Sequence, residues 1–494
     1  MKAESLHDDI IPAEFASGPA KPPAVASPSA CKPGPPPGGM GMGQPGAAAP
    51  PAPPERGEGR AAARAAAGAT KKRVVVVGGG FAGRAAQRAV AEAARGWFGP
   101  RVGVEVTLVD AKGYFEYTPA LLRCLVEPSA CKRALLPHPK AVQGTAVGFA
   151  TAVVAGERGE GGEEKEEGQK AGRAVATAVR LSDGRELPCD YCIWAQGAVY
   201  GDGALAGLSL RPRAASLAER ARELHEAHEA LLLASTVAVI GGGACGVELA
   251  AEIAGHFPGS KSILLLSRAE ALLAHMPGEA RRYAEAWLRK RGVQVLLGCE
   301  VLGRTPTADG RHRVATSAGG DLTVDLVFDC SGNRFDVPAA VGGLPGVAAG
   351  RGGLGADAHL RMAGLANVFV CGDVLDAPFP KTAFTADVTG RLAGRNAVHA
   401  LLGRPLLRYP EDACHGADRP PALECVSLYK YDGVFQFNGL VVPGLLAGGL
   451  KAFIERMQLA VAAGGCAATW SWRAIEDANV WLGRHLFLEG FVSA

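Results

Sequence analysis

Two glycine clusters are the parts of this sequence of 494 residues that could do chemistry most directly. Gly78, Gly80 and Gly83 follow the apolar run VVVV with the spacing G-x-G-x-x-G. The first glycine permits a tight turn, the second lets the backbone approach a pyrophosphate, and the third lets a helix pack closely on a strand. The helix start then offers unpaired N–H groups and a partial positive charge to the phosphates. Phe81 and Ala82, which stand between these glycines, are counted with them as expected cofactor-binding residues.

A carboxylate ends the next predicted strand. Asp110 closes the segment VEVTLVD, where it can accept hydrogen bonds from both ribose hydroxyls of a dinucleotide. A glycine motif alone is a weak indicator, because a glycine turn can exist without a ligand. Here strand, loop, helix, strand and terminal acid follow in order, which predicts a dinucleotide site.

The same pattern returns about 160 residues later. Gly241, Gly243 and Gly246 follow the apolar run TVAVI. The second strand of this unit ends in Ser267 and Arg268, where a site selective for NAD would place an acid. A serine and an arginine suit a 2′-phosphate, which favours NADPH over NADH. The alternatives are that Arg268 only faces solvent, or that the site accepts both coenzymes.

Two glutamates follow the second glycine cluster. Glu248 and Glu252 are four residues apart, so they share one face of the predicted helix, and Val247 and Ala251 lie on the opposite face. Acids near a helix start can also simply complement the helix dipole.

Twelve cysteines are spread along the chain and do not form a compact disulfide framework, which indicates a reducing compartment. Cys189 and Cys192 form a C-x-x-C, but in a strand these positions point to opposite faces and cannot readily close a disulfide. Cys124 and Cys131 have the wrong spacing for a redox pair. The remaining cysteines of interest are expected to be small buried side chains: Cys245, Cys330 and Cys371. The eleven histidines show no spacing typical of metal ligands.

Bulk composition narrows the class of protein. The net charge of +3 gives no reason to expect nucleic acid as a partner. No apolar run reaches the ~18 residues of a membrane-spanning helix, and the N-terminus has no signal-peptide core. We expect a protein that is cytoplasmic or peripheral to a membrane, while organellar targeting stays open. The segment GLVVPGLLAGGLKAF from Gly439 could meet a membrane surface or pack on the protein itself or a dimer partner.

The order of motifs predicts an α/β fold with two Rossmann-like dinucleotide-binding domains, the second inserted in the first. The chain before Lys71 is rich in Pro, Ala and Gly and is expected to be disordered. The expected organisation is a disordered segment 1–70, a first domain 71–220 with an acidic insertion 156–173, a second domain 221–335, the rest of the first domain 336–403 and a C-terminal α+β extension 404–494.

These motifs resemble the flavoproteins with two dinucleotide-binding domains. Within that family the sequence is most similar to the ferroptosis-suppressor and apoptosis-inducing-factor-like quinone reductases, and type II NAD(P)H dehydrogenases are more distant. The resemblance covers about residues 71 to 475. It is carried by VVVVGGGFAGRAAQ, YFEYTPALLR, VAVIGGGACGVELAAEI, NVFVCGD, PKTAF and SLYKYDGVFQFNG.

The resemblance implies FAD at the Gly78 loop and NAD(P)H at the Gly241 loop. It implies that Asp373 binds the ribityl and phosphate part of FAD and that Lys381 lies beside the flavin ring. It also makes Glu248, and then Glu252, the expected contacts to nicotinamide or flavin. Further implied FAD contacts are Arg123, Val153 and the turn residues Ala195 and Gly197, between which Gln196 replaces the family's threonine.

The implied activity is hydride transfer from NAD(P)H to FAD, followed by transfer of two electrons to a quinone. A pyridine nucleotide-dependent disulfide reductase is the main alternative. A redox-sensing regulatory flavoprotein of the apoptosis-inducing-factor type is another. A homodimer is also open.

Overall fold

The structure is a computed structural model, and it describes residues 71–95, 103–138, 140–153, 174–200, 215–335, 337–342, 344 and 353–485. The N-terminal segment 1–70, for which the sequence predicted disorder, and the acidic insertion 156–173 both lie outside these residues.

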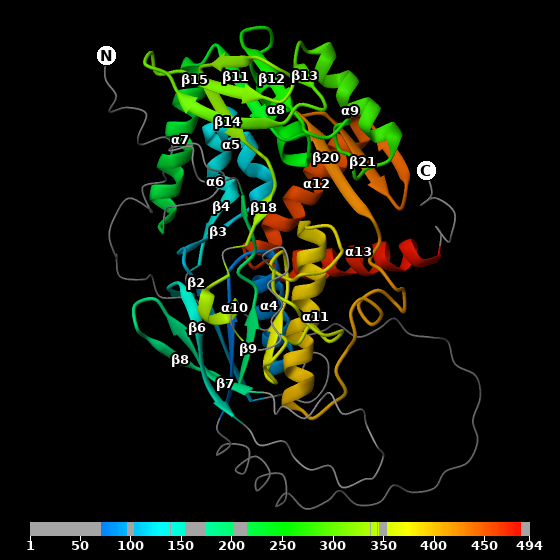
Figure 1. Ribbon diagram of the computed structural model, residues 1–494. Coiled ribbons are helices and arrows are strands. Elements are labelled where there is room, and N and C mark those ends of the chain that lie inside the picture. Colours follow the sequence, from blue (N-terminus) through cyan, green and yellow to red (C-terminus); the bar gives the residue numbers. More distant parts are fainter. Residues whose placement is uncertain are drawn as a thin grey trace, which may run out of the picture.

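A five-stranded parallel sheet forms the first nucleotide-binding unit, with the strand order β19-β9-β1-β2-β5. Val74 to Val77 are buried, as expected for a parallel strand covered on both faces. Helices α4 and α11 pack against each other and on this sheet (Figure 1). The elements are β1 (Lys72–Val77), α4 (Phe81–Arg95), β2 (Val104–Asp110), β5 (Val142–Gln143), β9 (Tyr191–Trp194), β19 (Val368–Val370) and α11 (Ala383–Leu401).

Smaller elements branch from this sheet. The segment after β2 forms a two-stranded antiparallel ribbon with short helices between its strands. A separate three-stranded antiparallel sheet has the order β6-β7-β8. The ribbon and its helices are β3 (Tyr114–Glu116), η1 (Thr118–Ala120), α5 (Leu121–Val126), η2 (Pro128–Ala130), α6 (Cys131–Ala134) and β4 (Leu135–Pro137). The sheet is β6 (Ala146–Val153), β7 (Ala174–Leu181) and β8 (Glu186–Pro188).

A four-stranded parallel sheet with the order β13-β12-β11-β17 forms the second unit, and a three-stranded antiparallel sheet, β14-β15-β16, flanks it. Helix α7 begins with a capping box in which the Ser216 side chain accepts from the Glu219 N–H. The main elements are α7 (Leu217–Leu233), β11 (Thr236–Ile240), α8 (Ala244–His256), β12 (Ser262–Leu266), α9 (Gly278–Lys290), β13 (Gln294–Leu296) and β17 (Leu326–Asp329). The flanking sheet is β14 (Val301–Pro306), β15 (His312–Thr316) and β16 (Asp321–Val324).

The second unit is inserted in the first. The chain leaves the first unit through β10 (Val199–Tyr200) and returns through β18 (Asn333–Arg334), and these two strands pair antiparallel. It then forms α10 (Ala339–Gly342), which packs against β6, and places β19 beside β9 in the first sheet. The predicted fold of two Rossmann-like units, one inserted in the other, is confirmed.

A C-terminal extension of α+β structure packs on both units (Figure 1). Its sheet contacts α8 and α9 of the second unit, while α13 reaches α4, where Arg473 pairs with Glu92 at 2.7 Å. The elements are β20 (Leu423–Leu428), β21 (Asp432–Phe437), β22 (Leu440–Pro443), α12 (Leu445–Ala462) and α13 (Cys466–His485). None of the described helices combines the length and the apolar character needed to cross a membrane.

One expectation about the strands is wrong. The sequence predicted that Cys189 and Cys192 lie in one strand, but β9 begins only at Tyr191. Asp190 fixes this start, because its carboxylate accepts the Arg73 N–H at 2.7 Å. Cys189 therefore lies between β8 and β9, and both thiols are buried.

Candidate functional site: two glycine loops joined by an acidic helix

The Gly78 loop has the backbone geometry that its sequence predicted. Gly78 has φ of 100°, and a Cβ there would lie 2.2 Å from the Ala195 carbonyl oxygen. A Cβ on Gly83 would lie 1.8 Å from the Gly78 carbonyl oxygen, so helix and strand pack too closely for any side chain. A Cβ on Gly80 would meet no atom within 4 Å. This is the position at which a pyrophosphate can approach the backbone and the start of α4.

Asp110 ends β2 beside this loop and is buried. Its Oδ2 accepts the Gly79 N–H at 2.5 Å and its Oδ1 accepts the Lys112 N–H at 2.8 Å. Burial raises the pKa of this carboxyl group, while Lys112 and the two N–H groups oppose the shift. A carboxylate that is anchored in this way can still offer its remaining lone pairs to ribose hydroxyls.

The turns after β9 and β19 lie at the same edge of the first sheet. Gly197 has φ of 74° and Gly372 has φ of 75°. A Cβ on Gly372 would lie 2.8 Å from the Cβ of Ala82, so the turn that carries Asp373 abuts the Gly78 loop directly. The carboxyl ends of parallel strands are where dinucleotides bind in such sheets. One cradle that could hold FAD is therefore surrounded by Asp110, Ala195, Gly197 and Asp373.

Gln196, which replaces the family's threonine, is held inward by its neighbour. The Trp194 indole Nε1 donates to the Gln196 Oε1 at 2.6 Å. The side chain is therefore part of the turn's own packing.

Lys381 stands just before α11, whose first turn is capped by Thr382 accepting from the Thr385 N–H at 3.2 Å. Its Nζ donates to the Leu375 carbonyl oxygen. Burial lowers the pKa of Lys381, and the carboxylates of Asp373 and Asp376 act in the opposite direction. The structure thus places a partly buried cation beside the Asp373 turn, and its proximity to a flavin ring stays a prediction.

The Gly241 loop repeats the geometry of the first. Gly241 has φ of 118°, and a Cβ there would lie 2.6 Å from the Cys330 carbonyl oxygen. A Cβ on Gly246 would lie 1.9 Å from the Gly241 carbonyl oxygen, whereas one on Gly243 would meet nothing within 4 Å. This loop can therefore also receive a pyrophosphate at the start of its helix, α8.

Ser267 and Arg268 follow β12 beside this second loop. Ser267 is buried, and its Oγ would lie 2.5 Å from a Cβ on Gly242. The Arg268 side chain is 81% exposed, with Nη1 3.5 Å from the Glu300 carboxylate. A guanidinium this exposed can turn toward a 2′-phosphate, because a surface ion pair contributes little to stability.

Glu248 and Glu252 are both buried on α8, and each has a partner that the sequence reasoning missed. The Glu248 Oε1 accepts from the Ser427 N–H at 2.8 Å, from the Ser427 Oγ at 3.0 Å and from the Lys451 Nζ at 3.0 Å. Ser427 and Lys451 both belong to the C-terminal extension. Burial lowers the pKa of Lys451, but the Glu248 carboxylate opposes burial and the net effect is a raised pKa. A contact from Glu248 to nicotinamide or flavin stays a prediction.

Glu252 ties α8 to the first unit. Its carboxylate accepts from the Arg123 Nε at 2.5 Å and Nη2 at 2.6 Å, in a bidentate pair. The Arg123 guanidinium also lies over the Tyr429 ring, 5.3 Å from its centroid. Arg123, predicted to contact FAD, thus joins both units and the extension. Val153, the other predicted contact, ends β6, and the structure does not describe its side chain.

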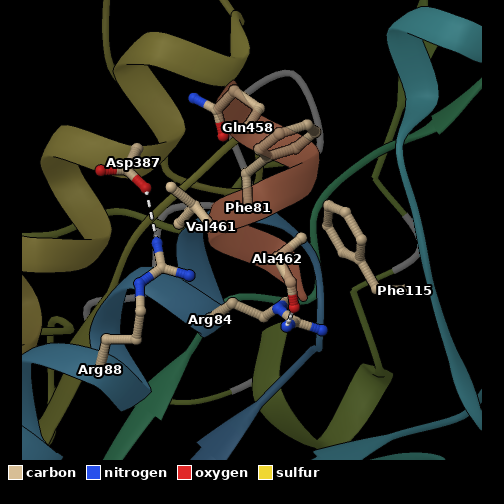
Figure 2. A pocket seen from close by; sticks show the side chains of 8 residues that line it. All are labelled: Phe81, Arg84, Arg88, Phe115, Asp387, Gln458, Val461 and Ala462. Atoms are coloured by element: carbon tan, nitrogen blue, oxygen red, sulfur yellow. Dashed lines mark hydrogen bonds and ion pairs between the residues drawn. The ribbon is translucent and has the colours of Figure 1, made fainter. Parts of the chain in front are cut away.

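A small pocket lies between α4 and α12 (Figure 2). Arg84 and Arg88 enter it from α4, and Phe115 enters from β3. Arg88 donates to Asp387 at 3.1 Å, while the Arg84 Nη2 donates to the Ala462 carbonyl oxygen at the end of α12 (Figure 2). The pocket is completed by Phe81, Gln458 and Val461.

Two pairs of thiols interact in the structure. Cys245 and Cys330 interact beside the Gly241 loop and are of intermediate burial, whereas the sequence predicted that both are buried. Cys124 and Cys131 interact in the core beneath α7, where burial and the neighbouring thiol raise the pKa of Cys124. Only Cys371 is the fully buried thiol that was expected.

Comparisons with known proteins agree with this architecture. A family model described as pyridine nucleotide-disulphide oxidoreductase matches residues 72–393. Ferroptosis suppressor protein 1 of Taeniopygia guttata is 29% identical over 384 residues, covering 75% of this chain and 89% of the relative. The Homo sapiens protein of that name is 28% identical over 379 residues, with the same two coverages.

A solved structure, the sulfide:quinone oxidoreductase of Aquifex aeolicus, superposes with a TM-score of 0.63 at 17% identity. The superposition covers 85% of this chain and 96% of that chain. At this identity the likeness concerns the fold alone, and the fold it covers extends beyond the two nucleotide-binding units.

Proposed function

The chain belongs to the pyridine nucleotide-disulphide oxidoreductase family, and from that premise we propose that it is an FAD-dependent NAD(P)H:quinone oxidoreductase. The family supports the coarser part of this statement, an oxidoreductase that uses FAD and NAD(P)H. Two similar proteins suggest the acceptor: the solved structure with the same fold is a sulfide:quinone oxidoreductase, and the relatives at 28–29% identity are ferroptosis suppressor proteins. What we add to the family-level activity is the acceptor, a quinone.

The observation that carries the proposal is the surface of the C-terminal extension. Helix α12 exposes Leu445 and Leu446 to 71% and 76%, and α13 exposes Trp470 to 73%. Phe453 and Trp481 are also exposed on these two helices. These exposed apolar side chains on α12 and α13 favour an apolar partner for the extension. A lipophilic quinone, or the membrane in which it dissolves, has this character.

The two glycine loops assign the nucleotides. The Gly78 cradle would hold FAD, with Asp110 receiving the ribose and the Asp373 turn lying along the ribityl and phosphate part. Bound FAD supplies the chemistry: it takes a hydride from the nicotinamide and passes two electrons to the quinone. Lys381, a partly buried cation beside that turn, would stabilise negative charge on the reduced cofactor.

Two buried ion pairs connect α8 to the first unit and to the C-terminal extension. Arg123 fixes Glu252 from the first unit, and Lys451 fixes Glu248 from the C-terminal extension. A hydride can pass only when donor and acceptor atoms are held within about 3–3.5 Å of each other. The pairs would therefore orient the coenzyme bound on α8 toward the cofactor of the first unit.

The coenzyme proposed for the Gly241 loop is NADPH in preference to NADH. Ser267 and Arg268 occupy the end of β12, where a carboxylate would repel a 2′-phosphate. Arg268 is exposed and has only a surface ion pair to exchange for the phosphate.

A disulfide reductase is the second candidate, because Cys124 and Cys131 form a contacting pair of thiols on α5 and α6. Both are buried: Cys124 donates to the Ala120 carbonyl oxygen at 3.5 Å, and Cys131 belongs to the same hydrophobic core. A disulfide substrate needs an exposed thiolate to attack it. Burial therefore favours the quinone reductase.

A steady-state assay tests the proposal. The purified protein should be yellow, and it should oxidise NADPH with a short-chain quinone as acceptor. The double variant C124S/C131S should keep that activity. Turnover of a disulfide that is lost in this variant, without turnover of a quinone, would establish the second candidate. Very slow turnover with a long-lived charge-transfer complex would indicate a redox-sensing flavoprotein.

A further inference from the structure

His138 lies at the Gly78 loop although no motif pointed to it. It follows β4, and its backbone N–H donates to the Gly113 carbonyl oxygen at 2.9 Å. A Cβ placed on Gly79 would lie 2.4 Å from the His138 Nε2 and 2.5 Å from the Asp110 Oδ2. The imidazole and the carboxylate therefore flank the same glycine, in the middle of the predicted FAD cradle.

Arg84 decides which ring nitrogen of His138 carries the proton. The Arg84 Nη1 lies 3.3 Å from the His138 Nδ1. A guanidinium can only donate, so Nδ1 must accept, and the imidazole is the neutral tautomer with its hydrogen on Nε2. Burial and the Arg84 charge lower the pKa of His138 to about 4, which agrees with a neutral ring.

The Nε2–H of His138 is a buried donor that faces an acid. The side chain is 2% exposed, and Nε2 has no hydrogen-bond partner among the residues that the structure describes. Its nearest acidic atom is the Asp110 Oδ2 at 3.9 Å, too far for a hydrogen bond but close enough for attraction. Buried polar groups without partners are rare and usually have a functional reason.

We propose that His138 is a positioning residue of the FAD site: oriented by Arg84, its Nε2–H keeps the Asp110 carboxylate ionised and in place for the adenosine ribose. The inference rests on the proposed assignment of FAD to the Gly78 loop. Asp110 must be ionised to accept from both ribose hydroxyls, and burial acts against that state. His138 adds a third N–H dipole to those of Gly79 and Lys112.

Retention of FAD by the full-length holoprotein tests this role without an activity assay. The quantity to measure is the dissociation constant of FAD, from the flavin fluorescence released on dilution. H138L removes the donor and should weaken binding about tenfold, equivalent to about 1.4 kcal/mol. H138Q can place an amide N–H near the Nε2 position and should stay within about threefold of wild type. H138N keeps a polar group near Nδ1 but is too short, and it should resemble H138L.

His228, a buried histidine on α7, provides a control. It is also buried, and its Nδ1 lies 2.9 Å from the Leu125 carbonyl oxygen, away from the loop. H228L should lower the melting temperature and leave the FAD dissociation constant unchanged. If H138L does not fold, the comparison of H138Q with H138N decides the matter.

A double-mutant cycle shows whether His138 acts through Asp110. D110N should weaken FAD binding by itself, and adding H138L to it should cause little further loss. Full additivity, equal loss in H138Q and H138N, or unchanged affinity in H138L would each overturn the inference. Wild-type protein that retains no FAD would overturn the assignment of the loop as well, so the two failures are distinguishable.

Discussion

Lys451 of the C-terminal extension lies 3.0 Å from Glu248 of the helix that begins at the second glycine loop. The two residues are 203 positions apart in sequence, and both side chains are largely buried. Ser427, from the same extension, donates to the same carboxylate oxygen. The extension therefore fixes the acid that the sequence predicts to contact nicotinamide or flavin.

Breaking this pair should destabilise the protein strongly. E248Q leaves the Lys451 ammonium buried without its counter-charge, and such a loss costs about 3 kcal/mol. The measurement is urea unfolding, with E226Q, which removes an exposed acid of α7, as the control. The double variant E248Q/K451M should recover part of the loss. Equal stability of E248Q and wild type would contradict an ionic pair.

The Arg123–Glu252 pair should depend on its bidentate geometry. R123K keeps the charge but can make only one point contact, so it should lower the free energy of unfolding by about 1–2 kcal/mol. It should also slow flavin reduction by NADPH, because Arg123 comes from the first unit and Glu252 from the second. Stopped-flow absorbance measures that step. A rate and stability equal to wild type would show that the pair does not hold the units together.

Glu476 should make stability depend on pH. Burial raises its pKa to about 8 from 4.5, and Asp387 adds to that effect while Arg391, 3.2 Å away, opposes it. The folded protein therefore keeps a proton that the unfolded chain releases above pH 4.5. This contribution to stability is fully present below pH 4.5 and is lost as the pH rises toward 8.

The variant E476Q isolates that contribution. Melting temperatures between pH 5 and pH 8 should fall more steeply for wild type than for E476Q, which cannot ionise. Parallel curves would show that Glu476 does not titrate differently in the folded and unfolded states.

Arg268 should select the coenzyme. R268A removes the guanidinium that can meet a 2′-phosphate, so the KM for NADPH should rise about tenfold, equivalent to about 1.4 kcal/mol, while the KM for NADH changes little. R291A removes another arginine of the same unit, at the end of α9, and serves as a control for net charge. Equal effects of R268A on both coenzymes would refute the preference for NADPH.

The glycine loops could be predicted because their function is local. Turn, close approach and helix packing are all set within six residues of chain, and the structure shows each of them. The partners of Glu248 and Glu252 could not be predicted, because they come from segments that only the folded chain brings together. The start of β9 after Cys189 could not be predicted either. It depends on Asp190 accepting a hydrogen bond from Arg73, which lies 117 residues earlier in the chain.

The sequence contains weak indications of two further residues of the first loop, His138 and Arg84. His138 stands in a polar turn after an apolar run, and such a histidine is usually a surface residue. Arg84 directly follows the third glycine of the first loop, in a helix whose neighbouring residues are mostly alanine. A charged residue at this point of a nucleotide-binding helix is a feature that sequence reasoning could have noted.

Anaerobic stopped-flow absorbance of the flavin shows which acceptor takes its electrons. Mixing the holoprotein with NADPH should bleach the flavin, and a second mix with a short-chain quinone should restore its absorbance within the turnover time. C124S/C131S should behave in the same way. A flavin that NADPH reduces but that only a disulfide reoxidises, and only when Cys124 and Cys131 are present, would rule out a quinone as the acceptor.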